Sequence, residues 1–209
     1  MLLAFDTATH AVTIALHDGT DVVAESTVVD ALRHGELLAP GIQQVLSDAG
    51  ATPRALTRIA VGVGPGPFTG LRVGIVTARA MGAVLGIPVD GVCTLDVLAV
   101  AVARMPDGFR VATDARRKEV YWASYDGDGS RSSAPAVDRP ADVAFEGPVA
   151  GRGAMLYPDA FPQGIPPENP NAADLARLVM SGATEMLPPE PLYLRRPDAV
   201  TPGQRKRVL

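Results

Sequence analysis

Hydrophobic residues fall in short runs over the first thirty positions and again near position 60. The runs at 2–7, 11–17 and 22–29 are continuously apolar or alternate with polar residues, and Asp18-Gly19 separates the second from the third. Such runs are typical of β-strands, and an Asp-Gly pair is a strong hairpin signal. Another apolar run covers residues 59–63. The pattern predicts three strands joined by hairpins and, later, a fourth strand.

Two segments instead carry apolar residues at helical spacing. The first covers residues 34–49, and Gly50 suits the position after its end. Pro40 removes one helical hydrogen bond, so this helix either kinks or begins there. The second covers residues 69–85, with Thr69 as the predicted N-cap. The apolar face of the first helix consists of Leu38, Ile42, Val45, Leu46 and Ala49.

The second helix has small residues at every fourth position, namely Gly70, Gly74, Ala78 and Gly82. Positions spaced by four form one row on a helix, and small side chains there allow a close approach by a neighbour. Each interior glycine costs about 0.5–1 kcal/mol relative to alanine, so close packing should compensate for that cost. Two interpretations stay open: the row faces a partner protein, or it packs on the protein's own sheet or a neighbouring helix.

Beyond residue 86 the elements are shorter. We expect an edge strand near Val89, a helix over 95–104 capped by Thr94, a hairpin of 109–113 with 119–125, weak strands near Val149 and a helix over 171–181. The segment 105–108 resembles a boundary, which gives two domains, 1–105 and 106–209, the second smaller with a basic tail. Because the pattern is not a run of βαβ units, a Rossmann fold is disfavoured.

Composition excludes several classes of protein. The chain has 209 residues, 47% of them hydrophobic, and a net charge of −4, which indicates a globular protein without a broad basic face. Its single cysteine, Cys93, cannot form an internal disulfide and fits a reducing cytosol. The first six residues lack the basic region of a signal peptide, and the longest apolar run, 97–103, is far below the about 18 residues of a membrane span. We therefore expect a cytoplasmic protein with no membrane contact.

Two stretches could bind a phosphate. Asp6 and Thr7 end the first strand, where a carboxylate and a hydroxyl could hold a metal-bound phosphate or could instead act as local acceptors in a turn. Gly64 and Gly66 precede a helix N-terminus, a possible anion site or simply a tight connection. The intervening prolines donate no N–H group, and no Lys-Ser or Lys-Thr pair follows, so a P-loop is disfavoured.

The remaining reactive side chains do not form a catalytic set. His10, His17 and His34 lack the spacing of metal ligands, and Cys93 without a histidine partner is best interpreted as a small buried residue. The mixed charges at 114–119 fit a solvated hairpin tip. The arginines and lysine at 195–207 could contact RNA phosphates or form a solubilising tail.

The glycine-rich block closely resembles the TsaB family, also called YeaZ, whose members belong to the bacterial machinery that makes threonylcarbamoyladenosine in tRNA. Supporting matches are spread over the whole chain, with Cys93 and Thr94 as local departures from the family's Gly-Val-Ser-Ser-Leu segment. The matching segments are Phe5–Ala8, Arg33–Pro40, Gly64–Gly74, Gly91–Leu95, Asp114–Tyr121 and Pro191–Arg195.

The resemblance implies an α/β, actin/Hsp70-like (ASKHA) fold of two lobes, each with a mixed sheet and the second reduced. It implies a subunit that binds the paralogous catalytic protein TsaD. With the ATPase TsaE, that complex transfers a threonylcarbamoyl group from its adenylate to the adenosine 3′ of the anticodon in ANN-decoding tRNAs. TsaD-type proteins carry a His-x-x-x-His metal pair on the helix matching residues 34–50, whereas Leu38 stands at the second position here. We therefore expect a non-catalytic subunit without a cofactor of its own, with ATP and metal in the partner subunits and tRNA reached through the complex.

The resemblance also implies that the first two helices from each protein pack as a four-helix bundle. Without TsaD the same patch would stay exposed, so we expect a homodimer. The alternative function is an actin-fold ATPase or phosphotransferase that uses Asp6 and the Gly64–Gly66 turn; a glycoprotease lacks its metal or nucleophile here. The predicted interface residues are Leu38, Ile42, Val45, Leu46, Arg72, Gly74, Ile75, Val76, Ala78, Arg79 and Gly82.

Overall fold

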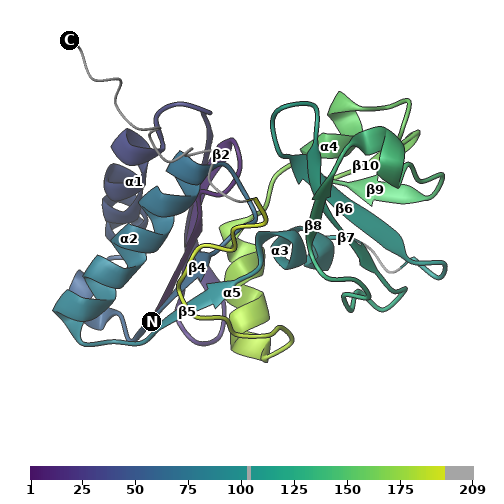
Figure 1. Cartoon of the computed structure of the whole chain (residues 1–209). Coiled ribbons are helices and arrows are strands. Elements are labelled where there is room, and N and C mark those ends of the chain that lie inside the picture. Colours follow the sequence, from purple (N-terminus) through teal and green to yellow (C-terminus); the bar gives the residue numbers. More distant parts are fainter. Residues whose placement is uncertain (103–104, 196–209) are drawn as a thin grey trace, which may run out of the picture.

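Two five-stranded sheets, one in each half of the chain, organise the protein (Figure 1). The computed structural model describes residues 1–102 and 105–195, and every structural statement below refers to these residues. Most of the basic tail that the sequence suggested as an RNA contact, residues 196–209, lies outside the described residues.

The first sheet has the order β3-β2-β1-β4-β5 and is mixed. β1 pairs antiparallel with β2, and β2 with β3, while β1 pairs parallel with β4 and β4 with β5. The three predicted hairpin strands and the fourth strand are therefore confirmed. Their bounds are Leu2–Asp6 (β1), Ala11–His17 (β2), Val22–Val29 (β3), Arg58–Gly62 (β4) and Val89–Val92 (β5).

Helices cover both faces of this sheet because its central strands are apolar on both sides. Successive strand residues point to opposite faces. Leu3 and Phe5 accordingly belong to the core under α1 and α2, whereas Leu2 and Ala4 pack with the residues of α5. Figure 1 shows α1 and α2 side by side on the outside of this lobe. The helix bounds are His34–Asp48 (α1), Phe68–Leu85 (α2) and Ala172–Ser181 (α5).

The second sheet has the order β10-β9-β6-β7-β8 and is smaller, since three of its strands have only three residues each. The β6–β7 hairpin was predicted, and β9 matches the weak strand expected near Val149. α3 and α4 both contact β6. The bounds are Phe109–Asp114 (β6), Val120–Tyr125 (β7), Ala136–Asp138 (β8), Pro148–Ala150 (β9), Gln163–Ile165 (β10), Thr94–Val100 (α3) and Arg152–Leu156 (α4). Both sheets are mixed and flanked by helices, and the second is the smaller. This architecture matches the predicted actin-like fold class.

Several helix ends differ from the predictions. α2 begins at Phe68 after Pro67, so Thr69 is not its N-cap. Thr94 is the first residue of α3 and Cys93 precedes it, and the Thr94 hydroxyl donates to Asp6 and does not cap the helix. α3 ends at Val100, earlier than predicted. Pro40 lies inside α1, which already begins at His34.

The chain returns to the first lobe after building the second. α5 falls within the range 106–209 that the sequence assigned to the second domain, yet it packs on β1 and β2. Farther along, Leu187 and Gly91 exchange two backbone hydrogen bonds of 2.8 and 2.9 Å beside β5. The division at residue 105 stays a prediction, but α5 and the segment around Leu187 pack with the first sheet.

Within the described part of the chain, α2 alone is long and apolar enough to cross a membrane by length and composition. Its row of small residues lies against the first sheet. A Cβ atom on Gly74 would come within 2.5 Å of the Thr7 hydroxyl oxygen, and one on Gly82 within 2.3 Å of a Val89 methyl group. The apolar character of this helix is therefore explained on its inner side by packing on its own sheet, the second interpretation left open by the sequence.

Candidate functional site

Asp6, at the end of β1, is fully buried and is the hub of a polar cluster. Its Oδ1 accepts a hydrogen bond from the Ala8 amide and its Oδ2 one from the Thr94 hydroxyl, both at 2.7 Å. The Thr94 hydroxyl in turn accepts from the Gly64 amide at 3.1 Å. Burial raises the pKa of Asp6 above its ordinary value, which these hydrogen bonds and nearby His34 partly offset. Asp6 thus joins β1, the glycine-rich turn and the start of α3.

The other predicted phosphate-binding groups are also engaged within the protein. The Thr7 hydroxyl donates to the Gly70 carbonyl at 2.7 Å. Gly66 lies so close to the first turn that a Cβ atom there would come within 2.1 Å of the Ala8 carbonyl oxygen. Because both Asp6 oxygens, the Thr7 hydroxyl and the Gly64 amide already have partners, this set does not fit a nucleotide phosphate. The glycine-rich stretch is a tight connection, as its local chemistry allowed.

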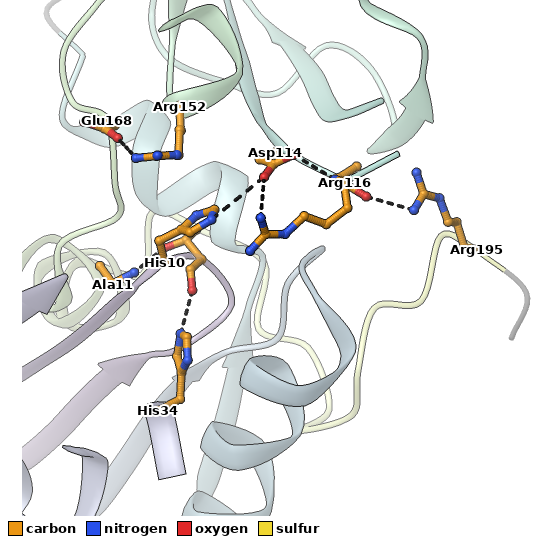
Figure 2. Close-up of polar contacts among 10 residues, drawn as sticks. His10, Ala11, His34, Asp114, Arg116, Arg152, Glu168 and Arg195 are labelled. Atoms are coloured by element: carbon orange, nitrogen blue, oxygen red, sulfur yellow. Dashed lines mark hydrogen bonds and ion pairs between the residues drawn. The ribbon is translucent and has the colours of Figure 1, made fainter. Parts of the chain in front are cut away.

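A small polar cluster lies between the two lobes (Figure 2). His10, from the β1–β2 turn, places Nε2 3.8 Å from Oδ2 of Asp114 at the end of β6, and Arg116 lies 3.5 Å from the same oxygen. Burial, followed by the charges of Arg116 and Arg152, lowers the pKa of His10. A neutral His10 beside Asp114 at pH 7 follows, so this contact is a polar contact between the lobes, not a strong ion pair.

His34 marks where the resemblance placed the first metal ligand. Its Nε2 lies 2.7 Å from the Thr9 carbonyl oxygen, which requires that nitrogen to carry the proton and donate (Figure 2). Leu38, at the second position, is buried in the apolar core. Among the residues that the structure describes, no group of three His, Cys, Asp or Glu side chains could hold a metal ion. His34 and Arg116 instead line a cavity of about 240 Å³ between the lobes.

Most of the predicted interface residues are inside the protein's own fold. The apolar face of α1 and the small-residue row of α2 are buried because they pack on the first sheet, so the prediction that these side chains line a partner surface is wrong for them. Only Arg72, Val76 and Arg79 of that set are exposed. The buried members are Leu38, Ile42, Val45, Leu46, Gly74, Ile75, Ala78 and Gly82.

The side of α2 that points away from the sheet carries an apolar surface; the predicted interface residues included Val76 on this surface but not Phe68 or Val84. Phe68, Val76 and Val84 are 50%, 63% and 85% exposed. The signal was available, since these residues are apolar and fall off the row of small residues. We call this surface the outer face of α2; its exposed residues are Phe68, Thr69, Arg72, Val76, Arg79, Ala80, Ala83 and Val84.

Cys93 behaves as predicted. It is buried, and burial, with the nearby Asp96 charge, raises its thiol pKa to about 12. A thiol with that pKa is protonated at pH 7 and is a poor nucleophile. The described residues therefore offer a polar cluster around Asp6, a neutral contact between the lobes and one uncovered helix face.

These features define a two-lobed, actin-like α/β protein. Comparisons with known proteins agree: the family model for TsaD, tRNA N6-adenosine threonylcarbamoyltransferase, matches residues 25–183. YeaZ from Pseudomonas aeruginosa superimposes with a TM-score of 0.78 at 30% identity, over 92% of this chain and 99% of that one.

The tRNA threonylcarbamoyladenosine biosynthesis protein TsaB of Escherichia coli is 34% identical over 172 residues, which cover 76% of this chain and 74% of that protein. An uncharacterised Mycobacterium leprae protein is 46% identical over 206 residues, 95% of this chain but 56% of that longer relative. The chain belongs to the TsaB (YeaZ) family, which acts in the biosynthesis of threonylcarbamoyladenosine in tRNA.

Proposed function

We propose that this protein is a non-catalytic subunit of the tRNA threonylcarbamoyladenosine synthase complex, and that it binds the catalytic TsaD-type paralogue through the outer face of α2 and the adjoining exposed side of α1. One observation carries the proposal: a well-packed helix keeps Val76 and Val84 exposed beside buried neighbours. Contiguous exposed apolar surface of this kind is characteristic of protein–protein contacts.

The chemistry of the reaction then belongs to the partners. The groups around Asp6 are engaged inside the fold, which weighs against the alternative of an ATPase or phosphotransferase built on the glycine-rich turn. ATP and metal are expected in the TsaD-type and TsaE-type subunits. The modified nucleoside is the adenosine 3′ of the anticodon in ANN-decoding tRNAs, and the complex works in the cytoplasm. When the paralogue is absent, the same helix face joins two copies of this chain.

The test is co-purification with the TsaD-type protein of the same cell, with and without nucleotide. Val76→Glu places a charge in the centre of the outer face and should abolish the complex at micromolar concentrations, because a buried unpaired charge is strongly unfavourable. Met155→Glu is the matched control: Met155 is 65% exposed, like Val76, but lies on α4 in the second lobe. Size-exclusion chromatography reports both complex and homodimer. A folded Val76→Glu variant that still binds the paralogue would remove the outer face from the interface.

A further inference from the structure

A pocket of about 410 Å³ lies where the N-terminus of α2, the loop between β6 and β7 and the segment 192–195 meet. It contains arginines and aromatic rings and no part of the Asp6 cluster. We call it the arginine–aromatic pocket and define it by Phe68, Arg116, Arg117, Tyr121, Tyr193 and Arg195. The pocket adjoins the N-terminal end of the outer face of α2, with which it shares Phe68, whereas Arg116, Arg117, Tyr193 and Arg195 have no part in the partner contact proposed above.

Two of its aromatic rings, those of Phe68 and Tyr193, form an exposed stack. Phe68 and Tyr193 have ring centroids 5.6 Å apart with an interplanar angle of 18°. The Arg72 guanidinium lies 3.7 Å from the centroid of the Phe68 ring and donates a 2.9 Å hydrogen bond to the Tyr193 hydroxyl. Although the three side chains hold one another in place, Phe68 remains 50% and Tyr193 43% exposed. Aromatic surface that is rigid and open to solvent is suited to stacking against a flat ligand.

Positive charge is concentrated at the same place. Arg116, Arg117 and Lys118 follow one another in the β6–β7 loop with φ angles of 59°, 55° and 60°, and all three are exposed. Non-glycine residues rarely adopt this left-handed conformation, and three in succession mark a loop whose shape is set by its surroundings.

The fixed loop is tied to the closing segment. Arg195 donates to the Ala115 carbonyl at 2.8 Å, and Arg116 pairs with Asp114 (Figure 2). Arg195 also pairs with Glu119. Arg116, Arg117 and Arg195 line the pocket, Lys118 follows Arg117 in the chain, and Arg72 packs on Phe68. In a chain whose net charge is −4, this is a local excess of positive charge.

Exposed aromatic rings bordered by arginines are the elements by which proteins bind unpaired nucleotides: the base stacks and the phosphates meet the cations. The pocket is too small for a duplex, and a net charge of −4 does not favour a broad basic face that could follow one. We propose that the arginine–aromatic pocket binds an unpaired nucleotide segment of the tRNA substrate directly. This rests on the proposed function for the identity of the RNA, though not for the chemistry of the pocket.

The experiment measures fluorescence anisotropy of three labelled probes with the full chain alone and in complex with its TsaD-type paralogue. The probes are a 17-nucleotide anticodon stem-loop of an ANN-decoding tRNA, its seven-nucleotide loop sequence as a linear strand, and a blunt duplex made from the stem. Unlabelled ADP serves as competitor to separate RNA from a free nucleotide, which shares the base and phosphate chemistry. We expect the stem-loop and the linear strand to bind, the duplex to bind at least tenfold more weakly, and ADP at tenfold excess not to displace them.

Two pairs of variants test the pocket. Tyr193→Ala should weaken stem-loop binding by about five- to 150-fold, the range that corresponds to stacking one base on an aromatic ring. Tyr193→Phe, which keeps the ring, should bind within about twofold of the parent protein. Arg117→Gln should lower the slope of log affinity against log salt by about 0.7, the value for one lost contact to a single-strand phosphate. Arg54→Gln removes an exposed charge near the opposite end of β4 and should leave the slope unchanged.

Several results would overturn the proposal that the pocket binds RNA. RNA binding that Tyr193→Ala and Arg117→Gln leave unchanged overturns the proposal, as does a parent complex that binds no RNA or releases it to ADP. Size-exclusion chromatography with the paralogue runs in parallel. Loss of partner binding with RNA binding intact shows that the pocket belongs to the protein interface and also overturns it. If the parent protein binds the RNA strand but does not bind the paralogue, the proposed function is wrong, whereas the proposal that the pocket binds unpaired RNA is supported.

Discussion

The inner and outer sides of α2 are both apolar, for different reasons. On the inner side, Gly74 and Gly82 lie so close to the first sheet that even one added carbon atom would overlap its side chains. On the outer side, no neighbour among residues 1–102 and 105–195 covers Val76 or Val84. A helix that is hydrophobic all around is normally buried on both sides. The sequence pattern therefore predicts correctly that both sides of α2 are apolar. It does not show which side packs within the protein and which is open to a partner.

The largest expected difference comes from one substitution made on each side. Ala78→Leu inserts a large side chain on the buried inner side and should lower the free energy of unfolding by about 1–3 kcal/mol. Ala80→Leu makes the same change two residues later, on the exposed side, and should alter stability by no more than about 0.5 kcal/mol. Urea denaturation of the two variants gives both values. Equal losses would show that the two sides of the helix are packed alike.

The sequence could predict the elements that depend on local pattern. The strands of the first sheet, α1, α2 and the β6–β7 hairpin follow from periodicity over a few residues. β8, β10 and α4 were missed because each has three to five residues and forms through its neighbours in the fold.

Contacts over long sequence separation could not be predicted from pattern. The hydroxyl that engages Asp6 comes from Thr94, 88 residues away, and Tyr193 reaches Arg72 over 121 residues. For that reason the sequence allowed Asp6 as a phosphate ligand and the small-residue row of α2 as a partner surface. The fold brings Thr94 to Asp6, and it brings Thr7 and Val89 against the small-residue row.

A second, smaller effect concerns the polar cluster beneath the N-terminal end of the inner side. Asp6→Ala leaves the Ala8 amide and the Thr94 hydroxyl without their acceptor, but it also removes a buried carboxyl group whose charged form is unfavourable. We expect a net loss of about 0.5–2 kcal/mol in the free energy of unfolding, measured by urea denaturation at pH 7. The folded variant should still bind the TsaD-type paralogue and support tRNA modification. A folded variant that binds normally and supports no modification would instead assign Asp6 a role in the reaction.

The smallest expected effect is a pH dependence of the free energy of unfolding, which arises from Asp6 in the polar cluster beneath the inner side of α2. Burial raises the pKa of Asp6 in the folded protein above its ordinary value of 3.8. The folded state therefore binds more protons than the unfolded state between 3.8 and the raised value, so the stability contributed by Asp6 is present at low pH and is lost as pH rises through that window. The Asp6→Asn variant keeps an acceptor for the Ala8 amide and does not titrate. The difference in free energy of unfolding between the parent protein and Asp6→Asn should fall by at most about 1.4 kcal/mol per pH unit within the window and stay level above it. Groups that do not interact with Asp6 are common to both proteins, so their contributions to the difference largely cancel. Urea denaturation curves at half-unit steps from pH 4 to pH 8 measure this difference in free energy of unfolding. A difference that stays constant over the whole range would show that burial does not raise the pKa of Asp6.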